Sequence, residues 1–147
     1  MPLLRALLVL LVPVALLAGC PPVGDDDDAA IDCTADNRPT LTIVSPDTGA
    51  QYDSGDSINW SLTITDPDTD PADLVIIVQD VTGSTAEDLD VTVPPPGGTG
   101  QTTFTMSADL LPSGAATPVR IVVEDPDLCS VNDQILICVD YSQPPCN

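Results

Sequence analysis

Aspartate side chains are crowded into two short loops whose chemistry suits a divalent cation. The first loop is Asp66-Pro67-Asp68-Thr69-Asp70-Pro71-Ala72-Asp73, and the second is Asp125-Pro126-Asp127. Calcium prefers oxygen ligands, and alternating aspartates in a turn can converge on one ion. The first loop is not an EF-hand, because the glycine at the sixth position and the closing glutamate are missing. The candidate calcium ligands are Asp66, Asp68, Asp70, Asp125 and Asp127.

The same two loops have a simpler interpretation as turns. An Asp-Pro pair suits the first two positions of a type I turn. The short aspartate side chain also accepts hydrogen bonds from backbone amides a few residues further on. The sequence therefore leaves two hypotheses open for these aspartates, calcium binding and turn stabilisation.

The composition argues against catalysis. An active site needs a base beside a nucleophile, a metal, or paired carboxylates in an apolar pocket. The chain has no histidine and no lysine, so the usual serine or cysteine relay cannot be assembled. Its aspartates sit in turns without apolar neighbours that would raise a carboxyl pKa. We expect no catalytic residues and no enzyme activity.

The N-terminal segment has the composition of a secretory signal peptide. Arg5 precedes an aliphatic run from Ala6 to Leu17 that only Pro13 interrupts. This run is shorter than the ~20 residues of a membrane-spanning helix. The leader ends Leu17-Ala18-Gly19-Cys20, which resembles the lipobox of bacterial lipoproteins. That resemblance implies that residues 1–19 are cleaved off and that Cys20 carries acyl chains.

Residues 20–38 read as a tether between this lipid and a folded domain. Pro21-Pro22 favours extended backbone, and Asp25 to Asp28 repel one another. Several acyl chains make a stable anchor, since each buried methylene contributes about 0.8 kcal/mol. In lipoprotein sorting, an aspartate after the cysteine retains the protein at the inner membrane, whereas this chain has Pro21. The resemblance thus implies a lipid-anchored protein of the bacterial cell envelope, at the outer membrane.

The net charge restricts the partners of the chain. Its formal charge is −20, from 23 acidic and three basic residues. Such a surface is repelled by nucleic acids and by anionic lipids. We therefore expect no nucleic-acid partner, and contact with the membrane only through the N-terminal lipid.

Four further cysteines follow Cys20, at Cys33, Cys129, Cys138 and Cys146. An even number of cysteines in an exported chain predicts two disulfides, for which three pairings exist. Zinc fits less well, because there is no C-x-x-C pair and no histidine.

The region after Pro39 reads as an all-β domain. Turn residues recur every eight to twelve positions, with short alternating apolar runs between them. In the clearest run, Ser57 to Asp66, apolar and polar side chains alternate, which predicts a strand with one buried face. Leu74 to Gln79 is apolar throughout and predicts a central strand. The expected strands cover residues 40–45, 57–66, 74–79, 89–93, 104–108, 119–124 and 135–139.

Loose motifs give a more specific resemblance. Residues 43–49 (IVSPDTG), followed by 54–58 (SGDSI), look like the opening two strands of bacterial immunoglobulin-like domains. Residues 111–114 (LPSG) before 119–125 resemble their late turn and the strand that ends in aspartate. The resemblance implies an immunoglobulin-like β-sandwich of about seven antiparallel strands over residues 39–147. Unlike antibody domains, the chain has Trp60 in its second expected strand, and no cysteine pair joins the second and sixth.

This topology has consequences for the loops and cysteines. In such a sandwich the first strand starts at the pole where the sixth ends, which implies a Cys33–Cys129 disulfide. Cys138 and Cys146 then remain at the other end, and a Cys129–Cys138 hairpin bridge is the competing pairing. The two aspartate loops would share one pole.

These features predict a role in binding rather than chemistry. We expect a membrane-anchored envelope lipoprotein that acts as a non-catalytic binding, adhesion or structural module, with an unidentified protein or surface as partner. One alternative is a calcium-dependent immunoglobulin-like module. Another is an accessory subunit that anchors an envelope complex.

Overall fold

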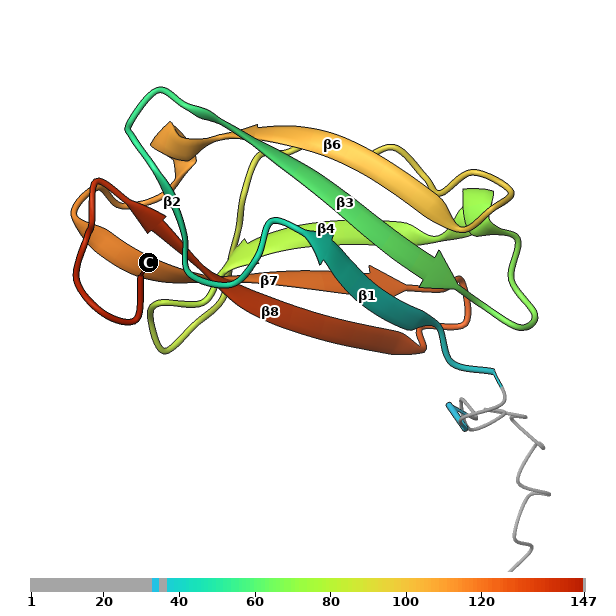
Figure 1. The fold of residues 1–147 in the computed structure, drawn as a ribbon. Helices are drawn as coiled ribbons and strands as arrows, with labels where there is room; N and C mark the ends of the chain where they lie inside the picture. Colours follow the sequence, from blue (N-terminus) through green and yellow to red (C-terminus); the bar gives the residue numbers. More distant parts are fainter. Residues whose placement is uncertain (1–32, 35–36, 147) are drawn as a thin grey trace, which may run out of the picture.

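The computed structural model describes residues 33–34 and 37–146. Two β-sheets pack face to face in this part of the chain (Figure 1). The expected signal peptide, Cys20 and most of the tether lie outside the described residues. Within them, no helix is long and apolar enough to span a membrane.

The described residues form eight strands and two short 3-10 turns. The three-stranded sheet has the order β1 (Thr40–Ser45), β3 (Ser57–Thr65), β6 (Gln101–Ser107). The five-stranded sheet has the order β2 (Ala50–Tyr52), β8 (Ser130–Val139), β7 (Ala115–Glu124), β4 (Val75–Asp80), β5 (Glu87–Asp88). The turns are η1 (Pro71–Asp73) and η2 (Ala108–Leu110).

This topology confirms the predicted fold class. Strands β1, β3 and β6 hold the positions of A, B and E in an immunoglobulin-like sandwich, and β4, β7 and β8 those of C, F and G. All neighbouring strands pair antiparallel except β2, which runs parallel to β8. β2 was not predicted, because three residues are too few to show a period.

The core lies between the sheets and follows the predicted alternation. Every second residue of β3 is at most 1% exposed, from Ile58 to Ile64. The Trp60 ring stacks on Phe104 of β6, with centroids 5.7 Å apart and planes 6° from parallel. Burial of this apolar face, at roughly 25 cal/mol per Å², provides the main free energy that holds the sheets together.

The expected strand at residues 89–93 is not formed. Only Glu87–Asp88 pairs with β4, and the chain then crosses to the other sheet. Leu89, Val91 and Val93 nevertheless pack against the core. Alternation of apolar and polar residues indicates which side chains face the core. A β-strand also needs the backbone of a neighbouring strand with which to form hydrogen bonds. This segment leads into three prolines, which have no N–H to donate to a ladder.

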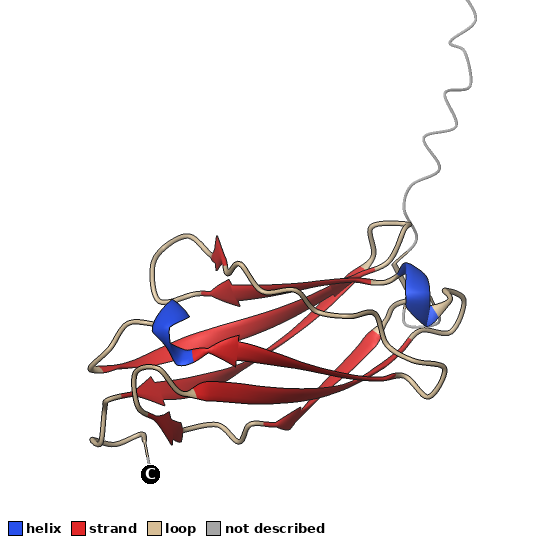
Figure 2. Ribbon diagram, turned by 90° about the horizontal axis from the view of Figure 1, so that it is seen from above, coloured by secondary structure: helices blue, strands red, loops and turns tan. Residues whose placement is uncertain are grey.

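The long strands separate two poles of the sandwich (Figures 1 and 2). The N-terminal pole holds loops 66–73 and 125–129, beside the point where the chain enters the domain. The C-terminal pole holds turns 53–56 and 111–114 and the segment 140–146. Glu124 pairs with Ser130 at the first pole, and Ala115 pairs with Val139 at the second.

Candidate functional site

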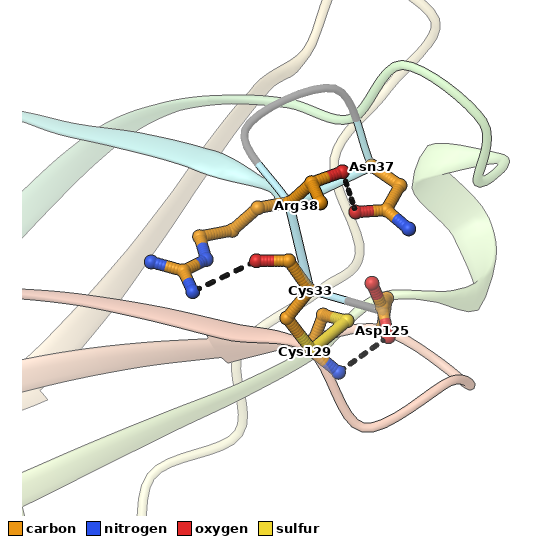
Figure 3. Close-up of a disulfide and its surroundings, with 6 residues drawn as sticks. Cys33, Asn37, Arg38, Asp125 and Cys129 are labelled. Carbon is orange, nitrogen blue, oxygen red and sulfur yellow. Dashed lines mark hydrogen bonds between the residues drawn. A yellow bond between two sulfur atoms is a disulfide. The ribbon is translucent and has the colours of Figure 1, made fainter. Parts of the chain in front are cut away.

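A disulfide at the N-terminal pole fixes the entry of the chain into the domain (Figure 3). Cys33 is bonded to Cys129, with Cα atoms 5.3 Å apart. Cys129 is buried, and its N–H donates to the Asp125 carboxylate at 2.8 Å. The Arg38 guanidinium donates to the Cys33 carbonyl at 3.0 Å. The second disulfide, Cys138–Cys146, lies at the other pole, so both pairings implied by the resemblance are present.

Three of the five candidate calcium ligands accept hydrogen bonds within their own loops. Asp66 Oδ1 accepts from the amides of Asp68 and Thr69 at 3.1 and 2.8 Å. Asp70 accepts from the amide of Ala72 at 3.0 Å and caps η1. Asp125 closes its loop onto Cys129, as described above. Asp68 and Asp127 are exposed.

The carboxylates of Asp66 and Asp68 influence each other's ionisation. Burial disfavours the charge on Asp66, but hydrogen bonds from Asp68 and Thr69 outweigh it and lower the pKa of Asp66. A side-chain hydrogen bond with Asp66 raises the pKa of Asp68, and the negative charges of Asp66 and Asp125 add to this effect. Figure 1 shows the two loops at one pole, after β3 and after β7, as the resemblance implied.

A ready-made metal site is not among these contacts. Within residues 33–34 and 37–146, no three acidic, cysteine or histidine side chains are grouped so that they could hold a metal ion. The turn hypothesis has the observed hydrogen bonds of Asp66, Asp70 and Asp125 in its favour. The calcium hypothesis stays a prediction.

An open cavity of about 550 Å³ lies at the C-terminal pole, and the sequence did not reveal it. It brings together the end of β2, the following turn and the segment after β8. Both tyrosines of the chain and three carboxylates contribute to its wall. The lining residues are Gln51, Tyr52, Asp53, Asp56, Asp140, Tyr141 and Ser142.

Asp140 holds this cavity together. Its backbone has a φ of 49°, and its N–H donates to the Tyr52 carbonyl at 2.9 Å. Its carboxylate accepts from the Ser54 amide at 3.1 Å, from the Ser54 hydroxyl and from the Ser113 hydroxyl at 2.6 Å. The Ser113 hydroxyl, and then Ser54, lower the pKa of Asp140 below its usual value. This carboxylate is therefore ionised at neutral pH and joins three turns.

The turn beside it presents two more carboxylates. Asp53 donates its N–H to the Asp56 carboxylate at 2.9 Å, and Asp56 donates its own N–H to the Asp53 carbonyl at 3.0 Å. Gly55 has a φ of 86°, a conformation that side chains disfavour. Its N–H donates to the Asp109 carboxylate at 2.8 Å, which ties the turn to η2.

Tyr52 joins the cavity to the core. It packs against the core cluster and also lines the cavity. Burial, followed by the negative charges of Asp47 and Asp56, raises the pKa of its phenol, which is therefore neutral at physiological pH. A sequence signal for this site existed, since a Tyr-Asp pair at 52–53 and an Asp-Tyr pair at 140–141 mirror each other. Only the β2–β8 pairing, which places Tyr52 opposite Val139, brings these pairs together.

Comparisons with known proteins give similarity of fold alone. No family model matches the chain, and no curated protein matches it. Among solved structures, a titin M3 domain is 12% identical, with a TM-score of 0.46, and the match covers 71% of this chain and 99% of that one. A superoxide reductase (neelaredoxin) from Ignicoccus hospitalis is 14% identical, with a TM-score of 0.46 and coverage of 71% and 82%.

A third solved structure belongs to a much longer protein. The twitchin kinase region from C. elegans is 8% identical, with a TM-score of 0.44, and the match covers 67% of this chain. The chain spans only 16% of that protein. The assignment of the fold rests on the strand order described above.

Proposed function

We propose that the chain is a lipid-anchored, non-catalytic module of the bacterial cell envelope that presents its C-terminal pole to a partner. The observation that supports this proposal is the separation of the two ends of the domain. The Cys33–Cys129 disulfide lies at one pole, and the open cavity lined by Tyr52 and Tyr141 lies at the other.

The distance between the two poles follows from the strands. β7 and β8 form a ladder of ten residue pairs, from Glu124–Ser130 to Ala115–Val139. At about 3.3 Å per residue, this ladder spans roughly 30 Å. An anchor attached ahead of Cys33 would therefore join the domain at the pole opposite the cavity, leaving the cavity free to meet a partner.

Acyl labelling tests the anchor. Cells that express the wild-type chain would be fed an alkyne-bearing fatty acid, and the label and membrane fraction would be measured. We expect a labelled, membrane-bound chain, and loss of both properties in Cys20→Ser. Cys33→Ser is the matched control, because it removes a cysteine but should keep the label. A label that persists in Cys20→Ser would refute the lipobox assignment.

Site-specific photocrosslinking in whole cells tests which pole meets a partner. A photoreactive amino acid would replace Tyr141 at the C-terminal pole or Asp70 at the N-terminal pole. We expect a discrete crosslinked protein from position 141 and none from position 70. Equal crosslinks from both positions to one assembly would instead support an accessory anchoring subunit.

A further inference from the structure

We propose that the cavity at the C-terminal pole binds a guanidinium or ammonium group on a basic side chain of a partner protein. The inference rests on the proposed binding function and specifies the chemical group of the partner that the cavity binds. It comes from three properties of the cavity, namely its aromatic rings, its unbalanced charge and its fixed geometry.

Aromatic side chains are scarce in this protein and half of them line the cavity. Of the four, Trp60 and Phe104 are stacked in the core, which leaves Tyr52 and Tyr141. The face of an aromatic ring attracts a cation within about 6 Å of its centre. Since Tyr52 packs against the core on one side, its position in the wall is held by the fold.

The carboxylates of the cavity have no cationic partner among the described residues. The lining contains Asp53, Asp56 and Asp140 and no basic side chain. Arg38 contacts Cys33 at the opposite pole, and Arg120 lies in the middle of the five-stranded sheet, opposite residues of β4 and β8. A positive group from outside would therefore meet three negative charges that the described part of the chain does not neutralise.

The hydrogen bonds of these carboxylates favour an organic cation over a metal ion. Asp140 already accepts from Ser54 and Ser113, and Asp56 accepts from Asp53. A metal ion needs free oxygen lone pairs at short distance. A guanidinium or ammonium group is attracted by the charge and by the rings, and it needs fewer free lone pairs.

Size and geometry agree with a side chain as the occupant. Small ligands bind in cavities of about 300 to 1,000 Å³, a range that includes this one. The turn that carries Asp53 and Asp56 is held by Asp109 and Asp140, so the negative wall exists before a ligand arrives. A wall that is already ordered loses less conformational entropy on binding.

The test is an NMR titration of the ¹⁵N-labelled full chain in a neutral detergent at physiological salt. The probes are two glycine-flanked peptides that differ only in one residue, arginine or its uncharged analogue citrulline. We expect the arginine peptide to shift the amides of Tyr52 and Tyr141, and the citrulline peptide to bind at least tenfold more weakly. Amides of Thr69 and Asp70, at the other pole, should not move.

Variants distinguish the contribution of the aromatic rings to binding from that of the negative charge. Tyr141→Leu should weaken arginine-peptide binding at least fivefold, whereas Tyr141→Phe, which keeps a ring, should retain most of it. Asp140→Asn should weaken binding at least fivefold, although it also loosens the cavity. Asp53→Asn removes a lining charge without breaking the bonds of Asp140, and it should weaken binding about threefold. Thermal melts would verify that each variant is folded.

The matched control addresses the high net charge, which attracts any cation. Asp68→Asn removes one negative charge at the N-terminal pole and should leave binding unchanged. An equal loss in Asp68→Asn and Asp53→Asn would overturn the inference, as would equal binding of both peptides. Saturable binding of free spermidine without any peptide binding would overturn the assignment to a partner's side chain.

The outcomes also distinguish this inference from the proposed function. Absence of the label from the wild-type chain, or a label that persists in Cys20→Ser, would refute the anchor and leave the cavity measurements intact. Crosslinks from position 141 without arginine binding would support the binding module and refute the cation as its ligand.

Discussion

The two poles of the sandwich use the same residue type for different purposes. At the N-terminal pole, Asp66, Asp70 and Asp125 accept from amides two to four residues further along their own loops. At the C-terminal pole, Asp140 accepts from Ser54 and Ser113, which are 86 and 27 residues away in the chain. The first arrangement shapes single loops, whereas the second joins separate turns into a cavity.

The difference shows what a high aspartate content can and cannot indicate. A carboxylate that caps its own turn has one oxygen engaged by local amides, as Oδ1 of Asp66, Asp70 and Asp125 is, so a cluster of such residues is not yet a site. A carboxylate that is held by groups from distant parts of the chain stays ionised at a fixed place. Aromatic rings beside it can then help it to bind a cation. The rings, and not the number of acids, distinguish the C-terminal pole.

Removal of the two disulfides should affect stability to different extents. Cys33–Cys129 closes a separation of 96 residues, and Cys138–Cys146 closes one of eight. In the chain-entropy model these loops correspond to about 4.7 and about 2.5 kcal/mol. The double variants Cys33→Ala/Cys129→Ala and Cys138→Ala/Cys146→Ala, unfolded by denaturant, should lose stability in that order. Equal losses would mean that local packing outweighs loop entropy.

Asp125 should be the most important single aspartate for stability. It is 3% exposed and accepts from the buried amide of Cys129. Asp125→Ala leaves that amide without its acceptor, at a cost of about 1 to 3 kcal/mol in the free energy of unfolding. Asp125→Asn, which keeps an oxygen acceptor, should cost less. If both variants unfold at the same denaturant concentration, the hydrogen bond is not the cause.

Asp140 should make the stability of the C-terminal pole sensitive to acid. Its folded pKa lies below the usual value of 3.8, so the folded state binds fewer protons than the unfolded state. The resulting stabilisation is present above that usual value and is lost as the pH falls through the folded pKa. Asp140→Asn should therefore be destabilising at pH 7, with the difference from wild type shrinking below about pH 4.

Asp68 at the N-terminal pole should behave in the opposite way. Its pKa is raised, first by the shared hydrogen bond with Asp66. Its folded state thus favours the proton, and ionisation at neutral pH opposes folding. Asp68→Asn should be neutral or slightly stabilising at pH 7 in the same denaturation experiment. A loss of stability comparable to that of Asp140→Asn would remove the contrast between the poles.

A thermal melt in calcium and in magnesium at matched ionic strength should give the smallest effect. One oxygen of each of the Asp66, Asp70 and Asp125 carboxylates is engaged by backbone amides, and the described residues hold no group of three metal-ligating side chains. We therefore expect equal shifts from charge screening in both salts. A rise specific to calcium that Asp68→Ala removes would support the calcium hypothesis instead.

The sequence predicted those features that depend on neighbours along the chain. The alternation around Trp60 predicted β3 and its buried face, and the Asp-Pro-Asp motifs predicted turns. The disulfides followed from a family topology, which also placed the two aspartate loops together. β2 and the cavity were missed, because both depend on a pairing between segments that lie far apart in the chain. The strand predicted at residues 89–93 was wrong for a related reason, since the apolar side chains of this segment reach the core although its backbone has no strand partner.

The positions of the two disulfides determine how the domain responds to mechanical load. Force applied between Cys33 and the C-terminal segment passes through one disulfide to Cys129, along β8 to Cys138, and through the second disulfide to Cys146. Only the stretch between Cys129 and Cys138 can lengthen, to about 30 Å when fully extended, whereas the unbridged chain would reach roughly 400 Å. Because β8 is already extended, the domain behaves as a nearly inextensible link even when its sheets separate.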